Sequence, residues 1–237
     1  MLEVRDLTKR FRGMVALNQV SFAVGGRQLV GVIGPNGAGK TTLFNIVAGR
    51  MRPTTGRVLF EGRPISGLPL HRAVAAGVAA TFQIPRPLRR LSVIENVAVV
   101  PPGLRARGGG SSPLDTLRRF ELDHVARALA GALTQGQLRL LEVARAVATG
   151  PRLLLLDEPY AGLTAEEMQR LTAVIRDLHA GGLTIIVVEH KLRELMRLVE
   201  HIIVLNYGRV LAAGAPAEVA RNPEVVEAYM GTHGAPV

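Results

Sequence analysis

A glycine-rich segment that ends in lysine and threonine is the part of the sequence with the clearest chemistry. Residues 34–41 read Gly-Pro-Asn-Gly-Ala-Gly-Lys-Thr and match the phosphate-loop pattern G-x-x-x-x-G-K-[ST]. They follow an apolar run at 29–33 and precede a helical pattern at 42–47. Glycines let backbone N–H groups turn towards phosphate oxygens, and the helix N-terminus adds positive potential. The segment therefore predicts a nucleotide-binding site.

Individual residues of this loop have separate expected roles. Lys40 is expected to contact the β- and γ-phosphates, and the Thr41 hydroxyl to ligate Mg²⁺. A glycine-rich turn that merely joins a strand to a helix is the alternative, and the complete motif in register disfavours it. The predicted nucleotide-binding residues of the loop are Gly34, Pro35, Asn36, Gly37, Ala38, Gly39, Lys40, Thr41 and Thr42.

Two adjacent carboxylates follow another apolar run, at 153–156. Asp157 stands where a residue is needed to hold Mg²⁺ from the second side, through a water molecule. Glu158 points in a different direction, and a carboxylate there can take a proton from the attacking water as general base. The alternative is a pair of acids that only solvate a strand end, and the phosphate loop makes it less favoured.

The elements that must position these residues alternate between strands and helices. A capping-box pattern at Thr164 and Glu167 opens a predicted helix that continues to Leu178 and ends at Gly181 and Gly182. Short runs that are apolar throughout are typical of strands buried on both faces of a parallel sheet. These runs are 29–33, 153–156, 185–188 and 202–205. The order of strands and helices predicts an α/β fold.

Other parts of the chain have different patterns. The segments 2–7, 20–24 and 58–60 alternate in character, which indicates a small antiparallel sheet beside the core. The strand pattern is missing from 84–132, where helical patterns at 91–100 and 114–133 flank a flexible loop at 108–113. We interpret this stretch as a helical insertion.

Composition narrows the classes of protein. With no cysteine, the chain has neither a disulfide framework nor a thiolate metal site. Its N-terminus lacks the apolar core of a signal peptide, and its apolar runs are far shorter than the ~20 residues of a membrane span. The net charge of +10 comes from scattered arginines, while aromatic residues make up 4% and tryptophan is absent. This argues against a nucleic-acid binder that stacks bases on exposed rings.

Several further segments resemble the motifs of ABC ATPases. Leu133-Thr-Gln-Gly-Gln137 resembles the signature motif LSGGQ, Gln83 the Q-loop glutamine, and His190 the switch histidine. Residues 161–163 occupy the D-loop position, and Phe11 stands where an aromatic ring stacks on adenine. The resemblance follows the order of motifs in that family over nearly the whole chain. It implies a RecA-like P-loop NTPase core with an antiparallel β subdomain and a small helical subdomain.

Within the family, the chain is most similar to ATPases of branched-chain amino-acid importers, through residues 82–88, 93–97, 153–163, 204–209 and 214–231. It departs from their pattern at Thr134, Lys191 and Ala80, and its helical insertion is shorter, whereas a larger residue than glycine at the position of Gln135 is common in that subfamily. The implied organisation is a single domain, 1–237, with the nucleotide-binding core at 1–84 and 149–237. The helical subdomain is expected at 85–148 and carries the signature.

The resemblance also implies a mechanism in which two ATPase chains enclose each ATP. Thr134, Gln135, Gly136 and Gln137 of one chain then cap the nucleotide held by the other. Gln83 senses Mg²⁺ and the attacking water, and His190 holds the γ-phosphate and orients Glu158. ATP and Mg²⁺ are the expected cofactors.

The implied partners are integral membrane permease subunits, a second ATPase chain and, indirectly, a substrate-binding protein; no nucleic acid is expected. The expected location is the cytoplasmic face of the membrane. Three alternatives remain open: a urea, amide or lipopolysaccharide system, an ABC ATPase that acts on nucleic acid or a protein complex, and a module that binds ATP without hydrolysis. For single residues, Phe11 can be core packing, Gln83 a buried turn residue and His190 a surface or capping histidine.

Overall fold

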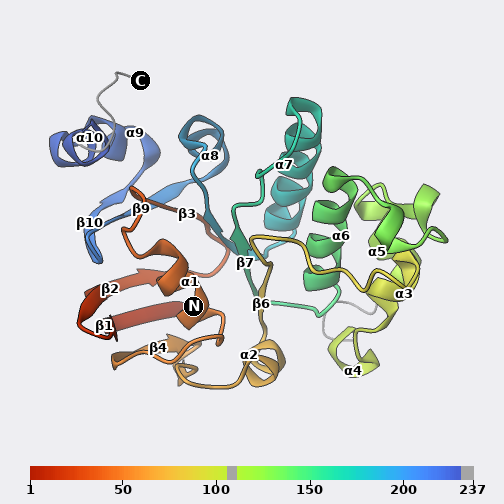
Figure 1. Cartoon of the computed structure of the whole chain (residues 1–237), viewed down its shortest axis with the longest axis horizontal. Helices are drawn as coiled ribbons and strands as arrows, with labels where there is room; N and C mark the ends of the chain where they lie inside the picture. The colour runs from red at the N-terminus through yellow and green to blue at the C-terminus, as the bar shows by residue number, and fades with distance from the viewer. Residues whose placement is uncertain (106–110, 231–237) are drawn as a thin grey trace. The chain divides into compact units, whose positions relative to one another are not determined.

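The computed structural model describes residues 1–105 and 111–230, so residues 108–110 of the predicted loop at 108–113 lie outside the described residues. The chain forms two compact units (Figure 1). We call them the terminal unit, Met1–Ala73 with Thr184–Val237, and the central unit, Val74–Leu183. The boundary passes through helix α2 (Leu70–Ala76). The predicted helical subdomain at 85–148 is a different, functional division and stays a prediction.

Parallel strands form the core of the terminal unit. Strand β3 (Leu29–Ile33) pairs in parallel with β8 (Thr184–Val188) on one side and with β9 (His201–Asn206) on the other. Every residue of β3 and β8 is buried, which explains why their sequences are apolar without alternation. Strand β10 (Arg209–Gly214) runs antiparallel to β9 at the sheet edge. The predicted strands at 29–33, 185–188 and 202–205 are confirmed.

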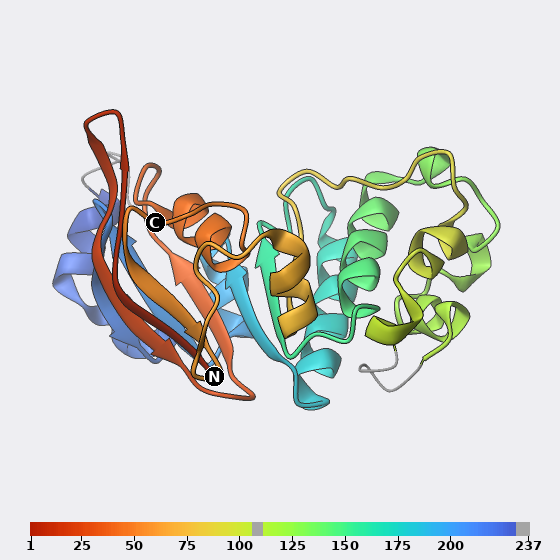
Figure 2. The same ribbon diagram turned by 90° about the horizontal axis from the view of Figure 1, so that it is seen from below.

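The terminal unit also contains the predicted antiparallel sheet, with strand order β2-β1-β4-β5. Its strands are β1 (Leu2–Phe11), β2 (Met14–Val24), β4 (Thr55–Phe60) and β5 (Arg63–Pro64). β1 and β2 are longer than predicted because the chain reverses only at Arg12 and Gly13, which both adopt positive φ angles (39° and 97°). The resulting long hairpin is visible in Figure 2. It carries Phe11 at its tip.

The helices of the terminal unit begin at the ends of its strands. Helix α1 (Lys40–Val47) starts at the lysine of the phosphate loop and buries Leu43, Phe44, Ile46 and Val47. Helix α8 (Leu192–Leu198) follows the candidate switch histidine. Helices α9 (Pro216–Arg221) and α10 (Pro223–Met230) follow β10 and lie beside it (Figure 1). None of the helices within residues 1–105 and 111–230 is long and apolar enough to span a membrane.

The central unit combines two parallel strands with a group of helices. Strand β6 (Val78–Ala80) pairs with β7 (Leu153–Asp157), whose five residues are all buried as predicted. Helix α7 (Ala165–Ala180) begins at Thr164, and the predicted capping box with Glu167 is present. The remaining helices are α3 (Val93–Ala98), α4 (Pro102–Arg105), α5 (Pro113–Arg119) and α6 (Gln135–Val147) (Figure 1).

The helix predicted at 114–133 is wrong beyond its first turns. Helix α5 ends at Arg119, because Glu121 adopts a left-handed conformation (φ 54°) and the Leu122 N–H donates to the Leu117 carbonyl. Only short 3₁₀ turns follow, η2 (Asp123–Val125) and η3 (Ala130–Ala132). The apolar residues that suggested a helix are buried, but they lie in turns, as Phe120 and Leu122 do.

Candidate nucleotide site

The phosphate loop joins β3 to α1 in the terminal unit. Lys40 is buried, and its Nζ donates hydrogen bonds to the carbonyl oxygens of Gly34, at 2.7 Å, and Pro35, at 2.9 Å. The ammonium group is thus held above the loop, while Asn36 and Gly37 are exposed. A cation, a helix N-terminus and an exposed glycine-rich turn together form an anion-binding site.

Gly34 is required for a steric reason that the motif alone does not show. Its φ angle is 152°, and a Cβ atom there would lie 2.1 Å from the carbonyl oxygen of Leu205 in β9. Gly37 also has a positive φ angle (80°), but a Cβ atom there meets nothing within 4 Å.

These two glycines provide a matched pair of substitutions. Gly34→Ala is expected to lower the free energy of unfolding by at least about 2 kcal/mol, because the backbone of β9 must move. Gly37→Ala is expected to cost about 1 kcal/mol, from the backbone conformation alone. Urea denaturation of both variants checks the difference. Equal losses of stability would show that the Leu205 carbonyl does not constrain the loop.

His190 lies at the carboxyl end of β8 in the terminal unit, and its side chain is exposed. The residue before it was missed by sequence reasoning. Glu189 is buried, and its Oε2 accepts hydrogen bonds from the backbone N–H groups of His190, at 2.8 Å, and Lys191, at 3.1 Å. This carboxylate fixes the backbone that carries the histidine. The signal was present in the sequence, since an acid at the end of a buried strand needs a partner.

Phe11 is 37% exposed at the tip of the β1–β2 hairpin, so core packing does not explain it. The Lys9 ammonium lies 5.0 Å from the centre of its ring. An exposed aromatic ring with a cation on it is suited to stacking on a planar base, but nothing in the structure shows this contact.

A second residue missed from the sequence lies in the C-terminal helix. Tyr229 of α10 is hydrogen-bonded to the backbone of Gly34, and burial raises the pKa of Tyr229 to about 12 although this hydrogen bond opposes the rise. The phenol therefore stays neutral across the physiological range. The C-terminal helix thereby contacts the first residue of the phosphate loop. No local pattern predicts such a contact.

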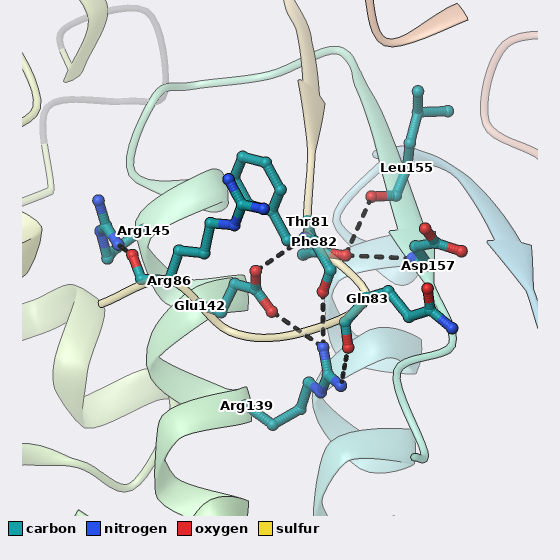
Figure 3. Close-up of polar contacts among 9 residues, drawn as sticks. All are labelled: Thr81, Phe82, Gln83, Arg86, Arg139, Glu142, Arg145, Leu155 and Asp157. Carbon is teal, nitrogen blue, oxygen red and sulfur yellow. Dashed lines mark hydrogen bonds and ion pairs between the residues drawn. The ribbon is translucent and has the colours of Figure 1, made fainter. Parts of the chain in front are cut away.

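In the central unit, Asp157 is the last residue of β7, and it is buried. Its backbone N–H donates to Thr81 Oγ1 at 3.1 Å, and the Thr81 N–H donates to the Leu155 carbonyl at 3.0 Å (Figure 3). These bonds fix the carboxyl ends of β6 and β7 together. Carboxylate and hydroxyl oxygens are the ligands that Mg²⁺ prefers, so Asp157 and Thr41 are chemically suited to the metal.

The structure brings Gln83 and Glu158 together. Gln83 Nε2 donates a hydrogen bond to Glu158 Oε2 at 3.0 Å. Gln83 is exposed, which excludes the alternative of a buried turn residue. Glu158 has a positive φ angle of 45°, an uncommon conformation for a residue other than glycine. Such strain is found preferentially at functional sites, where the surrounding structure maintains it.

The signature segment forms the N-terminus of α6. Thr134 is the N-cap: its Oγ1 accepts a hydrogen bond from the Gln137 N–H at 3.2 Å, and Gln137 Oε1 accepts from the Thr134 N–H at 3.0 Å. The threonine hydroxyl keeps its own proton for donation to a ligand. A Cβ atom on Gly136 would lie 2.0 Å from Glu167 Oε1 of α7, so a larger residue there would displace the Glu167 carboxylate. Gln135 follows the cap as the first residue of α6.

The candidate residues therefore form two sets, one in each unit. The terminal unit carries the phosphate loop, Phe11 and His190. The central unit carries Gln83, Asp157, Glu158 and the signature segment. Within the central unit, the side chains of Gln83 and Glu158 are joined by a direct hydrogen bond.

A phosphate loop after a buried parallel strand, with an Asp-Glu pair at the end of another, defines a P-loop NTPase. The family model described as "ABC transporter" matches residues 17–161, and the model described as "Branched-chain amino acid ATP-binding cassette transporter" matches 209–235. The chain belongs to the ABC transporter family and is an ATP-binding, ATP-hydrolysing member of it.

Similar proteins match this chain over nearly its full length. The chain is 39% identical to the high-affinity branched-chain amino acid transport ATP-binding protein BraF of Pseudomonas aeruginosa, covering 98% of each chain. It is 35% identical to the lipopolysaccharide export system ATP-binding protein LptB of Acidithiobacillus ferridurans, covering 98% of this chain and 97% of that one. A crystal structure of a nucleotide-free ATP-binding cassette from an ABC transporter superposes with a TM-score of 0.85 at 30% identity, over 97% of this chain and 98% of the other. This structural match confirms the ABC ATPase fold.

Proposed function

We propose that this chain powers the uptake of branched-chain amino acids through separate integral membrane permease subunits, at the cytoplasmic face of the membrane. The observation that carries the proposal is the match of residues 209–235 to the branched-chain amino-acid cassette model. This C-terminal segment lies beyond the matched ABC transporter domain at 17–161, so it adds information about the subfamily. The similarity to BraF over 98% of both chains supports the same substrate class.

ATP binding begins at the phosphate loop in this proposal. The backbone N–H groups of residues 34–42 and the Lys40 ammonium hold the β- and γ-phosphates, and the Phe11 ring stacks on adenine. Thr41, Asp157 and Gln83 would hold Mg²⁺, which when bound would neutralise charge on the phosphate oxygens. The buried carboxylate of Asp157 and the exposed hydroxyl of Thr41 suit that ion.

Hydrolysis then depends on Glu158. Its carboxylate takes a proton from a water molecule, whose oxygen forms a bond to the γ-phosphorus while the bond to the bridging oxygen of ADP breaks. The products are ADP and inorganic phosphate. Gln83 orients Glu158 through the bond at 3.0 Å, and His190 contacts the γ-phosphate.

Each ATP-binding site is completed by a second ATPase chain. The Thr134 hydroxyl, with Gln135, Gly136 and Gln137 at the N-terminus of α6, caps the nucleotide bound to the partner's phosphate loop. We infer a pair of related but different chains in the cell, with a substrate-binding protein acting indirectly through the permease. Hydrolysis and phosphate release then allow the pair to separate.

Lipopolysaccharide export is the second candidate function, favoured by the 35% identity to LptB. The two candidates give different phenotypes. Cells without this chain are expected to lose uptake of radiolabelled leucine, with recovery by the wild-type chain and not by Lys40→Met. Normal leucine uptake together with a defective outer membrane would instead favour the export system.

A further inference from the structure

Helix α6 carries a buried ion pair that the ATPase motifs do not include. Arg139 is 1% exposed and Glu142 is 7% exposed, and Arg139 Nη1 lies 3.0 Å from Glu142 Oε2. Burial of two charges carries a large desolvation cost, and their mutual attraction offsets it only when additional hydrogen bonds satisfy their remaining donors and acceptors. The other partners of the pair therefore indicate what it does.

Those partners are backbone groups of residues 82–86, which we call the glutamine loop. Arg139 donates from Nη1 to the Phe82 carbonyl and from Nη2 to the Gln83 carbonyl, both at 2.8 Å. Glu142 Oε1 accepts a hydrogen bond from the Phe82 N–H at 2.7 Å. Figure 3 shows both side chains of α6 directed at this loop. The loop contains neither helix nor strand, so these side chains supply partners that secondary structure otherwise provides.

A third residue of α6 holds the far end of the glutamine loop. Arg145 Nη1 donates to the Arg86 carbonyl at 2.8 Å, and the Arg86 guanidinium lies 4.9 Å from the centre of the Phe82 ring (Figure 3). Burial raises the pKa of Glu142, and the Phe82 N–H and the Arg139 charge oppose the rise. Arg139 therefore favours the ionised form of Glu142, which accepts the loop hydrogen bond most strongly.

The contacts between α6 and the glutamine loop link two groups of candidate functional residues. Gln83, whose carbonyl is held by Arg139, donates through its side chain to Glu158. At the other end, α6 begins at Gln135, directly after its N-cap Thr134, and continues without a break to Val147, so Arg139 and Glu142 lie on the same rigid element as the signature segment.

We propose that Arg139 and Glu142 are positioning residues for ATP hydrolysis, which fix Gln83 to the signature helix and so set the place of the Glu158 carboxylate. Engagement of the signature segment by nucleotide would then move the general base together with α6. The inference rests on the proposed function, because it takes Glu158 as the base and Thr134 to Gln137 as the nucleotide cap.

A double-mutant cycle distinguishes this positioning role from a purely structural role of Arg139. Arg139→Met is expected to lower kcat about 30-fold with KM for ATP changed less than about threefold, since the phosphate loop is untouched. In a chain that already carries Gln83→Ala, the same substitution is expected to lower kcat less than about threefold. Arg139→Lys, which keeps one donor, is expected to fall between Arg139→Met and wild type.

Two further variants control for effects on folding. Arg139→Met combined with Glu142→Leu removes both charges, so no buried charge remains unpaired; it is expected to fold normally and still turn over slowly. Arg119→Met breaks the exposed ion pair of Arg119 with Asp177, at 2.8 Å, and is expected to keep wild-type kcat. An equal loss of kcat from Arg139→Met with and without Gln83 would overturn the inference.

Hydrogen exchange tests the attachment without relying on turnover. The Phe82 amide is expected to exchange at least about tenfold faster in the Glu142→Leu chain, because it loses its acceptor. Unchanged exchange would overturn the inference whatever the kinetics. Faster exchange in a protein whose wild type hydrolyses no ATP under any condition would contradict the proposed function and leave the attachment of the loop intact.

Discussion

Glu158→Gln is expected to reduce ATP turnover by about 10³-fold, since a positioned general base contributes about 10²–10⁴-fold to such reactions. Glutamine has nearly the same size as glutamate and keeps an oxygen that can accept the hydrogen bond from Gln83 Nε2. This bond is 3.0 Å long in the wild-type chain. It cannot take a proton from water. Binding of ATP is expected to change less than about threefold, because Glu158 lies outside the phosphate loop. Single-turnover phosphate release and nucleotide titration measure the two effects separately.

Glu166→Gln is the matched control for this substitution. Glu166 lies in the first turn of α7 in the same unit, and its side chain is 75% exposed beside Arg170. Exposed pairs of this kind contribute at most about 1 kcal/mol to stability, so wild-type turnover is expected. Retention of more than about a tenth of the activity by Glu158→Gln would exclude Glu158 as the base.

Lys40→Met is expected to weaken ATP binding about 100-fold, which corresponds to the loss of charge-assisted hydrogen bonds to phosphate. Methionine fills a similar volume in this buried position without the charge. The folded state is expected to persist with a loss of about 1–3 kcal/mol in the free energy of unfolding, because the Gly34 and Pro35 carbonyls lose the hydrogen bonds from Nζ.

Isothermal titration with ATP and Mg²⁺ measures this loss, and thermal unfolding verifies the fold. Arg193→Met on α8 controls for net charge, since it removes one exposed cation from the same unit. Its ATP affinity is expected to match wild type. Wild-type affinity in the Lys40→Met chain would refute the role given to the phosphate loop.

Much of the fold follows from local sequence patterns. Strands β3, β7 and β8 are buried on both faces, so apolar side chains at every position make them visible in the sequence. The start of α7 was predictable for a different reason, because a capping box is a local exchange of hydrogen bonds between Thr164 and Glu167.

The error at α5 shows where local patterns fail. Phe120 and Leu122 continue a helical spacing after the helix has ended, since burial requires only that a side chain reach the core. Helical periodicity in a short segment does not separate a helix from a series of compact turns. The residue that adopts the left-handed conformation after α5 is Glu121 and not a glycine, so the local sequence contains no marker of the helix end.

The residues of the candidate site also fall into two groups, those that local sequence patterns predict and those that they do not. Residues of the phosphate loop and the Asp-Glu pair were identified because their motifs are contiguous in sequence. Glu189, Tyr229 and Arg139 were not, because their partners come from backbone groups that tertiary structure brings near. A buried charge at the end of a strand or in a helix is the signal that sequence reasoning can use to search for them.

Nucleotide-dependent dimer formation tests the central claim most directly. Light scattering is measured for the wild-type chain and for Glu158→Gln, each with and without ATP and Mg²⁺, beside phosphate release in the same samples. The account predicts a stable dimer of Glu158→Gln in the presence of ATP, with phosphate release by the wild type alone. Phosphate release by Glu158→Gln at the wild-type rate, or a dimer whose amount does not depend on ATP, would contradict this mechanism.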